Sequence, residues 1–208
     1  MTAEALLRIE AAGVVLEAER SVPEDASGVV VVADGARRTR MSRRHREITG
    51  QLNTVGLATI LLDTAPGRDR LPPDTGLVSG RLAAVLDWAG GRPETAGLPC
   101  GLLCSGTAVA AGLLTAARRI DLVRALVGWD GRPNVGVTTL VQVAAPTLLA
   151  VDSGDQSAVQ ACEYAAAHLA GVCKLHSMPG TVPGENGERT EAVGRAAAAW
   201  FGEHFRDD

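Results

Sequence analysis

The stretch Leu98-Pro-Cys-Gly-Leu-Leu-Cys-Ser-Gly-Thr-Ala108 is followed directly by Val109-Ala-Ala-Gly-Leu-Leu-Thr-Ala-Ala117. The first part is a short apolar run that ends in small residues. The second part is an alanine-rich run of the kind that favours a helix. The sequence therefore predicts a buried strand, a sharp turn and a helix in immediate succession. Such a turn needs small residues around its apex, because the two backbone arms approach each other closely.

Similar apolar runs recur along the chain and alternate with helical patterns. We expect an antiparallel hairpin at 6–10 and 14–19, and buried strands at 29–33, 56–63, 123–129, 146–152 and 173–178. Helices are expected at 42–54, 76–89, 156–170 and 188–205, and the helix that follows the turn after 98–105 is expected to run to about 119. This alternation implies right-handed crossovers and a mostly parallel sheet. The predicted fold class is α/β, one doubly wound domain over residues 1–208 with helices on both faces and ligands at the carboxyl ends of the strands.

The composition limits the classes of function. The chain has 208 residues, 46% of them apolar and 21% charged, and a formal net charge of -4. This balance is typical of a globular domain, and the negative charge does not favour nucleic-acid binding. The sequence contains no long apolar run and no secretory signal pattern, so we expect a cytoplasmic protein without membrane contact.

The cysteines lack the close paired spacing of zinc ligands. They are Cys100, Cys104, Cys162 and Cys173. We expect them to be small buried residues in a reducing compartment, and we predict neither a metal nor a cofactor.

Nearly the whole chain resembles small dienelactone-hydrolase-type α/β hydrolases. The resemblance rests on the segments 29–35, 56–63, 98–113, 131–133, 145–151 and 178–180, whose order and spacing are similar to the family's. It implies the α/β-hydrolase fold, in which the strand, turn and helix of 98–117 form the elbow that presents the nucleophile. It also implies ester or lactone hydrolysis by a nucleophile, a histidine, an acid and an oxyanion hole.

A glycine occupies the nucleophile position that this resemblance implies. Counted from Gly101 and Thr107, the apex of the elbow falls on Gly106, and Ser105 and Cys104 come one and two residues earlier. A shift of one residue at a strand end turns a side chain to the opposite face of the sheet. Ser105 or Cys104 would therefore act as nucleophile only in a remodelled turn, and Cys104 otherwise belongs to the core.

The resemblance also implies positions for the base and the acid. Pro183 stands where the family's histidine follows the last strand, and proline cannot transfer a proton. Of the histidines in the chain, His45 is the least unsuited, because its helix follows the oxyanion loop. The others are expected to be structural or solvated: His168, His176 and His204. Asp155 matches the family's aspartate, with N-capping of the next helix as its alternative role, and Asp152 is a second candidate.

The oxyanion loop expected after the strand at 29–33 has an unusual sequence, Asp34-Gly-Ala-Arg37. The amide of Ala36 could donate to an oxyanion, but the carboxylate of Asp34 would oppose the developing charge unless Arg37 or Arg38 neutralises it. Together with Gly106 and Thr107, this loop is expected to border the ligand pocket.

Arginines are concentrated between residues 37 and 46. Arg38, Arg40 and Arg44 lie near the predicted start of a helix, where guanidinium groups and helix amides suit a phosphate or carboxylate. The alternative is a solvated helix face whose arginines pair with local acids. The predicted partner is a small, anionic ligand or an acidic protein, and neither nucleic acid nor membrane is expected.

The sequence leaves three functions open. The absence of both nucleophile and histidine on an intact scaffold favours a degenerate hydrolase fold, a pseudoenzyme that binds a small molecule or a partner protein. The second function is an active ester or lactone hydrolase that uses Ser105 or Cys104 with Asp155 and either a displaced histidine or a water relay. The third is a cyclase or isomerase that uses Asp34, Asp155 and arginines for acid–base chemistry.

Overall fold

The computed structural model describes residues 2–11, 13–35, 39–65, 74–179 and 186–206. Its strands are β1 (Thr2–Ala11), β2 (Val14–Pro23), β3 (Gly28–Asp34), β4 (Leu57–Leu62), β5 (Cys100–Ser105), β6 (Val123–Trp129), β7 (Thr147–Asp152) and β8 (Cys173–Met178). In the described residues they form one eight-stranded sheet in the order β1-β2-β4-β3-β5-β6-β7-β8. Strands β3 to β8 run parallel, and the β1–β2 hairpin pairs antiparallel with β4.

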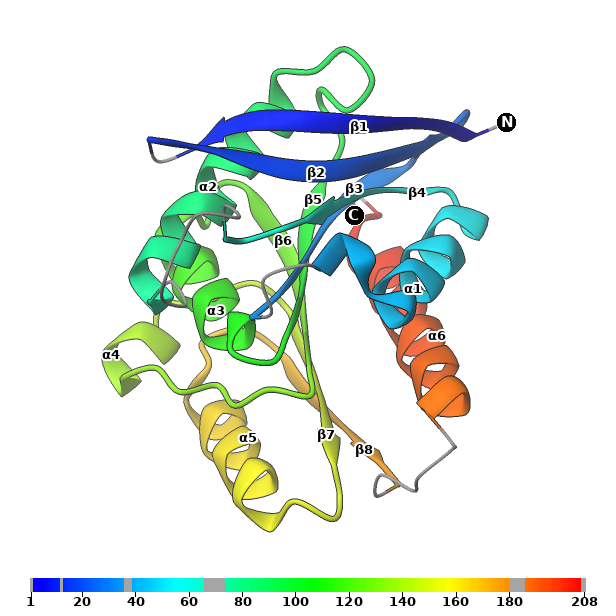
Figure 1. Cartoon of the computed structure of the whole chain (residues 1–208). Helices are drawn as coiled ribbons and strands as arrows, with labels where there is room; N and C mark the ends of the chain where they lie inside the picture. The colour runs from blue at the N-terminus through cyan, green and yellow to red at the C-terminus, as the bar shows by residue number, and fades with distance from the viewer. Residues whose placement is uncertain (1, 12, 36–38, 66–73, 180–185, 207–208) are drawn as a thin grey trace.

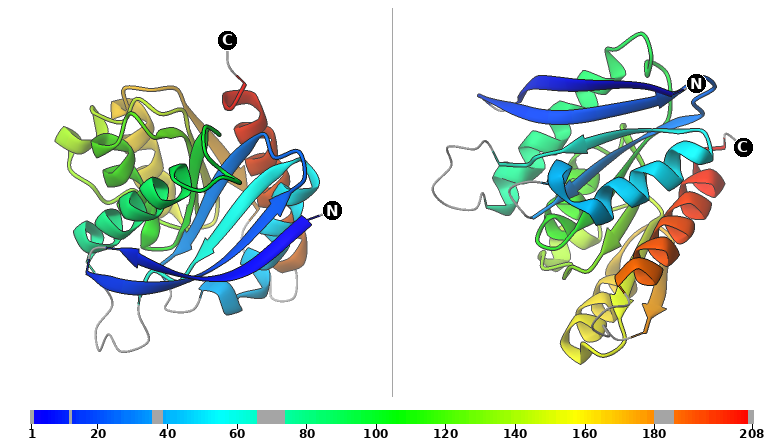
Figure 2. Two further views of the ribbon diagram at one scale, coloured as in Figure 1. Left: turned by 90° about the horizontal axis from the view of Figure 1, so that it is seen from above. Right: turned by 45° about the vertical axis from the view of Figure 1, so that its right-hand side comes forward.

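Helices cover both faces of this sheet (Figure 1). They are α1 (Arg43–Thr54), α2 (Thr75–Gly90), α3 (Ala108–Arg118), α4 (Val137–Leu140), α5 (Gln156–His168) and α6 (Asn186–His204), and a 3-10 turn spans Thr39–Met41. Helices α1 and α6 pack side by side on one face, and α2, α3 and α5 lie on the other (Figure 2). The predicted doubly wound α/β fold is confirmed. None of the described helices combines the length and hydropathy that a membrane span requires.

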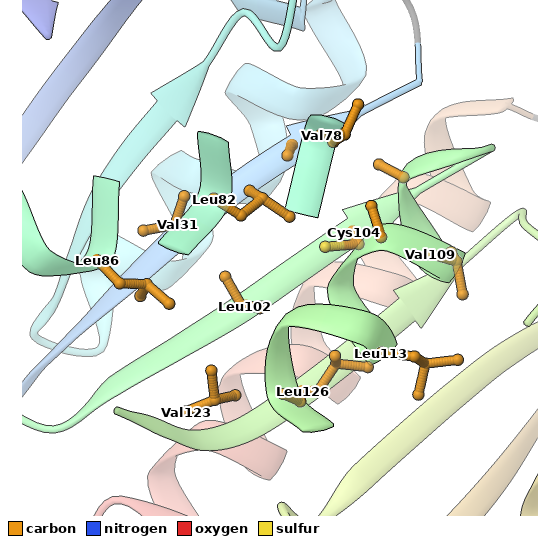
Figure 3. Close-up of a cluster of buried hydrophobic side chains, with 14 of the residues drawn as sticks. Val31, Val78, Leu82, Leu86, Leu102, Cys104, Val109, Leu113, Val123 and Leu126 are labelled. Carbon is orange, nitrogen blue, oxygen red and sulfur yellow. The ribbon is translucent and has the colours of Figure 1, made fainter. Parts of the chain in front are cut away.

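The central strands are continuous apolar runs because both of their faces are buried. Along β3, Val30 and Val32 belong to the core beneath α1 and α6, whereas Val31 belongs to the core beneath α2 and α3. In the core beneath α2 and α3, Val31 lies near Leu82 of α2 and Leu102 of β5 (Figure 3).

The strand order reverses at β3. Strand β4 pairs with one side of β3, and β5, the next parallel strand in the chain, pairs with the other side. In open α/β sheets a crevice forms at such a switch point, outside the carboxyl ends of the strands. This topology brings Asp34, at the end of β3, next to Ser105, at the end of β5.

The face beneath α6 has a close approach that only glycine allows. A Cβ atom at Gly101 of β5 would lie 2.6 Å from Cε1 of Phe201 and 2.8 Å from Cζ of Phe205. Both phenylalanines are buried, so they have little room to move aside.

We therefore expect Gly101→Ala to lower the free energy of unfolding by about 1–3 kcal/mol through overpacking, measured by urea denaturation. The control is Gly80→Ala in α2, where an added Cβ meets no atom within 4 Å. That variant should match the parent or gain up to about 1 kcal/mol from helix propensity. An unchanged stability of Gly101→Ala would contradict the tight contact between β5 and α6.

Candidate functional site

The predicted strand, turn and helix are present at the centre of the sheet. Strand β5 ends at Ser105 and α3 begins at Ala108. Between them, Gly106 has a φ of 57°, in the left-handed region that glycine adopts without strain. Its amide donates to the carbonyl of Trp129 at 3.1 Å, which fixes the turn against β6.

The carboxylate of Asp34 lies over this glycine. A Cβ atom at Gly106 would be 2.9 Å from Oδ1 of Asp34. The same point is 3.9 Å from the backbone nitrogen of Gly35, whose amide donates to the carbonyl of Ser105 at 3.2 Å. The space into which a side chain at position 106 would extend is therefore bordered by a negatively charged group.

The hydroxyl of Ser105 points away from the cavity, into the layer beneath α1. Ser105 is 3% exposed and its Oγ lies 2.8 Å from Nε2 of His45, which is 1% exposed. The same nitrogen faces Oδ2 of Asp34 at 3.6 Å, and Nδ1 has no hydrogen-bond partner among the described residues. In a Ser–His–Asp triad the serine and the acid bond to opposite nitrogens of the ring. Here both neighbours share one nitrogen, so the cluster lacks the geometry of a proton relay.

The surroundings of His45 favour the neutral form of its imidazole. Burial lowers the pKa of this imidazole, the charge of Asp34 raises it, and the charge of Arg44 lowers it, with a pKa below the usual value as the net result. The ring lies 5.8 Å from that of Trp129, and the guanidinium of Arg44 lies over the same indole at 5.1 Å. A neutral ring suits a hydrogen bond with a serine hydroxyl.

Cys104 lies on the opposite face of β5. It is fully buried in the core beneath α3, where its side chain lies near Val109 (Figure 3). Burial, together with the charge of Asp34, raises the pKa of its thiol to about 12. The thiolate is the reactive form of cysteine, so in this conformation Cys104 is an unreactive thiol.

A cavity of about 1030 Å³ opens at the carboxyl ends of β5, β6 and β7. Gly106 and Thr107, at the start of α3, line it. Its charged lining residues are Arg44, Arg132, Arg189, Asp130, Asp152 and Asp155. Positive and negative groups therefore share one open space.

Ion pairs connect these charges across the cavity wall. Arg189 of α6 pairs with Asp152 at 2.8 Å and with Asp130, and Arg44 of α1 lies 3.6 Å from Asp130. Asp130 has a φ of 49°, a conformation that costs a non-glycine residue roughly 1–2 kcal/mol. In this conformation its carboxylate lies between arginines of two helices.

Asp155 lines the cavity as well as capping a helix. Its side chain accepts from the amide of Ala158 at 3.0 Å, as an N-cap of α5, and pairs with Arg132 at 3.1 Å. The bond from the Ala158 amide, with the nearby Arg132, lowers the pKa of this carboxyl. The N-capping role that the sequence offers as the alternative is therefore present, and the same side chain borders the cavity.

The structure separates the other predicted residues. Gly106, Thr107, Arg44, Asp152 and Asp155 line the cavity, whereas Ser105, Cys104 and Asp34 are not among its lining residues. Ala36, Arg37, Arg38 and Pro183 lie outside the described residues.

Most described arginines between residues 37 and 46 form ion pairs with nearby acidic side chains, which was the alternative to anion binding. Arg40 is bound to Asp63 at 2.9 Å and also to Glu17, and Arg46 pairs with Glu19 at 3.2 Å. Only Arg44 of the described arginines in this segment lines the cavity.

Asp130, Arg132 and Arg189 are the charged site residues that sequence reasoning missed. Asp130 had a signal, since it directly follows a predicted buried strand and precedes a glycine. Arg189 had no such signal, because it comes to the cavity only when α6 packs against the sheet. Among the described residues, no group of three or more His, Cys, Asp and Glu side chains is arranged to hold a metal ion.

The chain is similar to known proteins over different lengths. A dienelactone hydrolase from Anabaena variabilis has a solved structure that is 31% identical, with a TM-score of 0.92 and coverage of 99% of each chain. Est1E from Butyrivibrio proteoclasticus is 16% identical, with a TM-score of 0.78 and coverage of 95% of this chain and 99% of that one. The second likeness shows the fold alone. No protein-family model matches the sequence.

Two curated relatives come from strains of Mycobacterium tuberculosis and are named as phosphoribosyl transferases. Each is 36% identical over 190 residues, which is 89% of this chain and 43% of the relative. The chain thus spans less than half the length of these relatives.

The buried histidine predicts a pH dependence of stability. Because the folded pKa of His45 lies below its ordinary value of about 6.5, the unfolded chain binds the proton more tightly in that range. The contribution of His45 to stability is therefore lost as the pH falls through about 6.5. We expect the free energy of unfolding to fall less between pH 7.5 and 5 in His45→Gln than in the parent. Equal pH slopes in urea denaturation would contradict this arrangement.

Proposed function

Because the chain belongs to the dienelactone-hydrolase-type family of α/β hydrolases, we propose that it binds a small polar ligand in the cavity and does not hydrolyse esters through a Ser–His–Asp triad. One observation carries the proposal: the apex of the elbow is Gly106, and the carboxylate of Asp34 borders the space above it.

Charge supports this reading. Acyl transfer develops negative charge on the substrate oxygen, and hydrolases place hydrogen-bond donors around that oxygen. Removal of a single donor costs about 10²–10³ in rate. A carboxylate beside Gly106 has the opposite sign to a donor, so it disfavours that transition state.

The lining of the cavity favours a ligand with an anionic group and several hydroxyls. Guanidinium groups bind phosphate or carboxylate oxygens through paired hydrogen bonds, and ionised Asp side chains accept from hydroxyls. Arg132 and Asp155 offer both functions at the rim, where each is about half exposed. The name of the M. tuberculosis relatives indicates which class to test first, a phosphorylated ribose.

A second candidate function has one observation in its favour. The 2.8 Å contact between Ser105 Oγ and His45 Nε2 is the arrangement by which a histidine activates a serine. Hydrolysis through this pair would require a rearrangement that exposes both buried side chains to the cavity.

Covalent labelling separates the two candidates. We expect the intact mass of the native protein to stay unchanged after treatment with a fluorophosphonate, because none of the described residues presents an activated hydroxyl to the cavity. Iodoacetamide should leave Cys104 unmodified, since its thiol is buried and its pKa is about 12. Stoichiometric fluorophosphonate labelling that disappears in Ser105→Ala would instead establish the serine hydrolase.

Calorimetric titration with ribose 5-phosphate tests the ligand class. We expect binding that Arg132→Ala weakens at least tenfold, because a charge-assisted hydrogen bond to an anion is worth about 1.5–3 kcal/mol. The matched control is Arg118→Ala, an exposed arginine in the last turn of α3, away from the cavity. Absence of binding by the parent, or equal weakening by both variants, would contradict a phosphorylated ligand at this rim.

A further inference from the structure

Strand β1 leaves one long side of the sheet open. It is the outermost strand, ten residues long, and β2 is its one partner among the described strands (Figure 1). Its odd-numbered residues turn toward the core, where Ile9 and Ala11 are buried. Its even-numbered residues are exposed, and they are Thr2, Glu4, Leu6, Arg8 and Glu10. An exposed edge of this length is a template for pairing with another strand.

The hydrogen bonds of the hairpin determine which backbone groups face the open edge. The carbonyl of Glu17 in β2 accepts from the amide of Asp63 at 3.0 Å, on the side away from β1. A residue of an antiparallel strand directs its N–H and C=O to the same side. Since Arg8 is the register partner of Glu17, this pair is not hydrogen-bonded, and Arg8 directs its N–H and C=O outward. By alternation, Leu6 does the same.

The charges on the exposed residues of β1 favour one register for a second copy of the strand, the register that forms the most ion pairs over the longest overlap. Antiparallel pairing about a two-fold axis at Leu6 places Glu4 opposite the partner's Arg8, and Arg8 opposite the partner's Glu4. Shifting the axis to residue 7 brings Glu4 opposite Glu10, and shifting it to residue 8 brings Arg8 opposite Arg8. An axis at residue 9 also pairs opposite charges, Arg8 with Glu10, but it overlaps only residues 7–11.

The side chains on this edge are suited to that register. Leu6 is 74% exposed. At the two-fold axis it would pack against Leu6 of the second copy, and the two side chains would shield each other from water. Within the described residues neither Glu4 nor Arg8 forms an ion pair, and Glu17, beside Arg8 on β2, pairs with Arg40. Cross-strand pairs of opposite charge stabilise a sheet, and like charges directly opposite destabilise it.

We propose that the β1 edge is a homodimer interface, in which two copies join their sheets antiparallel about Leu6 with reciprocal Glu4–Arg8 ion pairs. This surface lies on the β1 side of the sheet and does not include the lining residues of the cavity. The proposal is therefore independent of the proposed ligand.

Sedimentation velocity of the full chain tests the interface by charge exchange. Over about 1–200 µM the parent should show a concentration-dependent monomer–dimer equilibrium. Arg8→Glu places like charges opposite each other twice per dimer, so we expect the dimer to weaken at least tenfold. Glu4→Arg combined with Arg8→Glu recreates the ion pairs in reverse and should restore dimerisation to within about threefold of the parent. A parent that stays monomeric throughout, or a double variant no tighter than Arg8→Glu, would overturn the proposal.

A backbone variant gives an independent test. Because the N–H of Leu6 points to the open edge, Leu6→Pro removes a bond to the partner without removing one to β2. We expect it to abolish the dimer while circular dichroism shows an intact fold. The control is Glu163→Arg at an exposed position of α5, and this variant should dimerise as the parent does. Dimerisation of Leu6→Pro with the parent's affinity would place the interface elsewhere.

Discussion

The close contact between the end of β3 and the turn after β5 is the constraint on which the site depends. Three glycines allow it, because a Cβ atom would press on Thr107 at Gly35, on Asp34 at Gly106, and on the carbonyl of Gly106 at Gly131. The ends of β3, β5 and β6 therefore converge within van der Waals distance. Their convergence places the carboxylate of Asp34 over the turn on one side and beside the imidazole of His45 on the other.

The converging strand ends leave side chains of opposite charge around the cavity. Arg189 joins α6 to the ends of β6 and β7 through Asp130 and Asp152, and Arg44 joins α1 to the same Asp130. These pairs connect helices from one face of the sheet to loops at its edge. A ligand that replaced one of these pairs would remove a contact that holds α1 or α6 against the strand ends.

The fold could be predicted from the sequence because its signals are local. Continuous apolar runs mark the buried strands, and the glycine at the elbow follows from the spacing that the family resemblance implies. The alternation of side chains along a strand also predicts that Ser105 and Cys104 face opposite layers, as they do. The four-residue helix α4 was missed because it is too short to carry a helical period. Arg189 was missed because its partner Asp130 is 59 residues away, and no local pattern records such a pair.

The left-handed conformation of Gly106 also bears on how this protein can change over generations. Every residue that a single codon change could introduce there has a Cβ atom, and that atom would meet both an unfavourable backbone conformation and the oxygen of Asp34. Such a variant would lose stability before it gained any new chemistry. A nucleophilic side chain at position 106 would therefore begin with a cost in stability, set by the backbone conformation of the elbow and by its contact with Asp34.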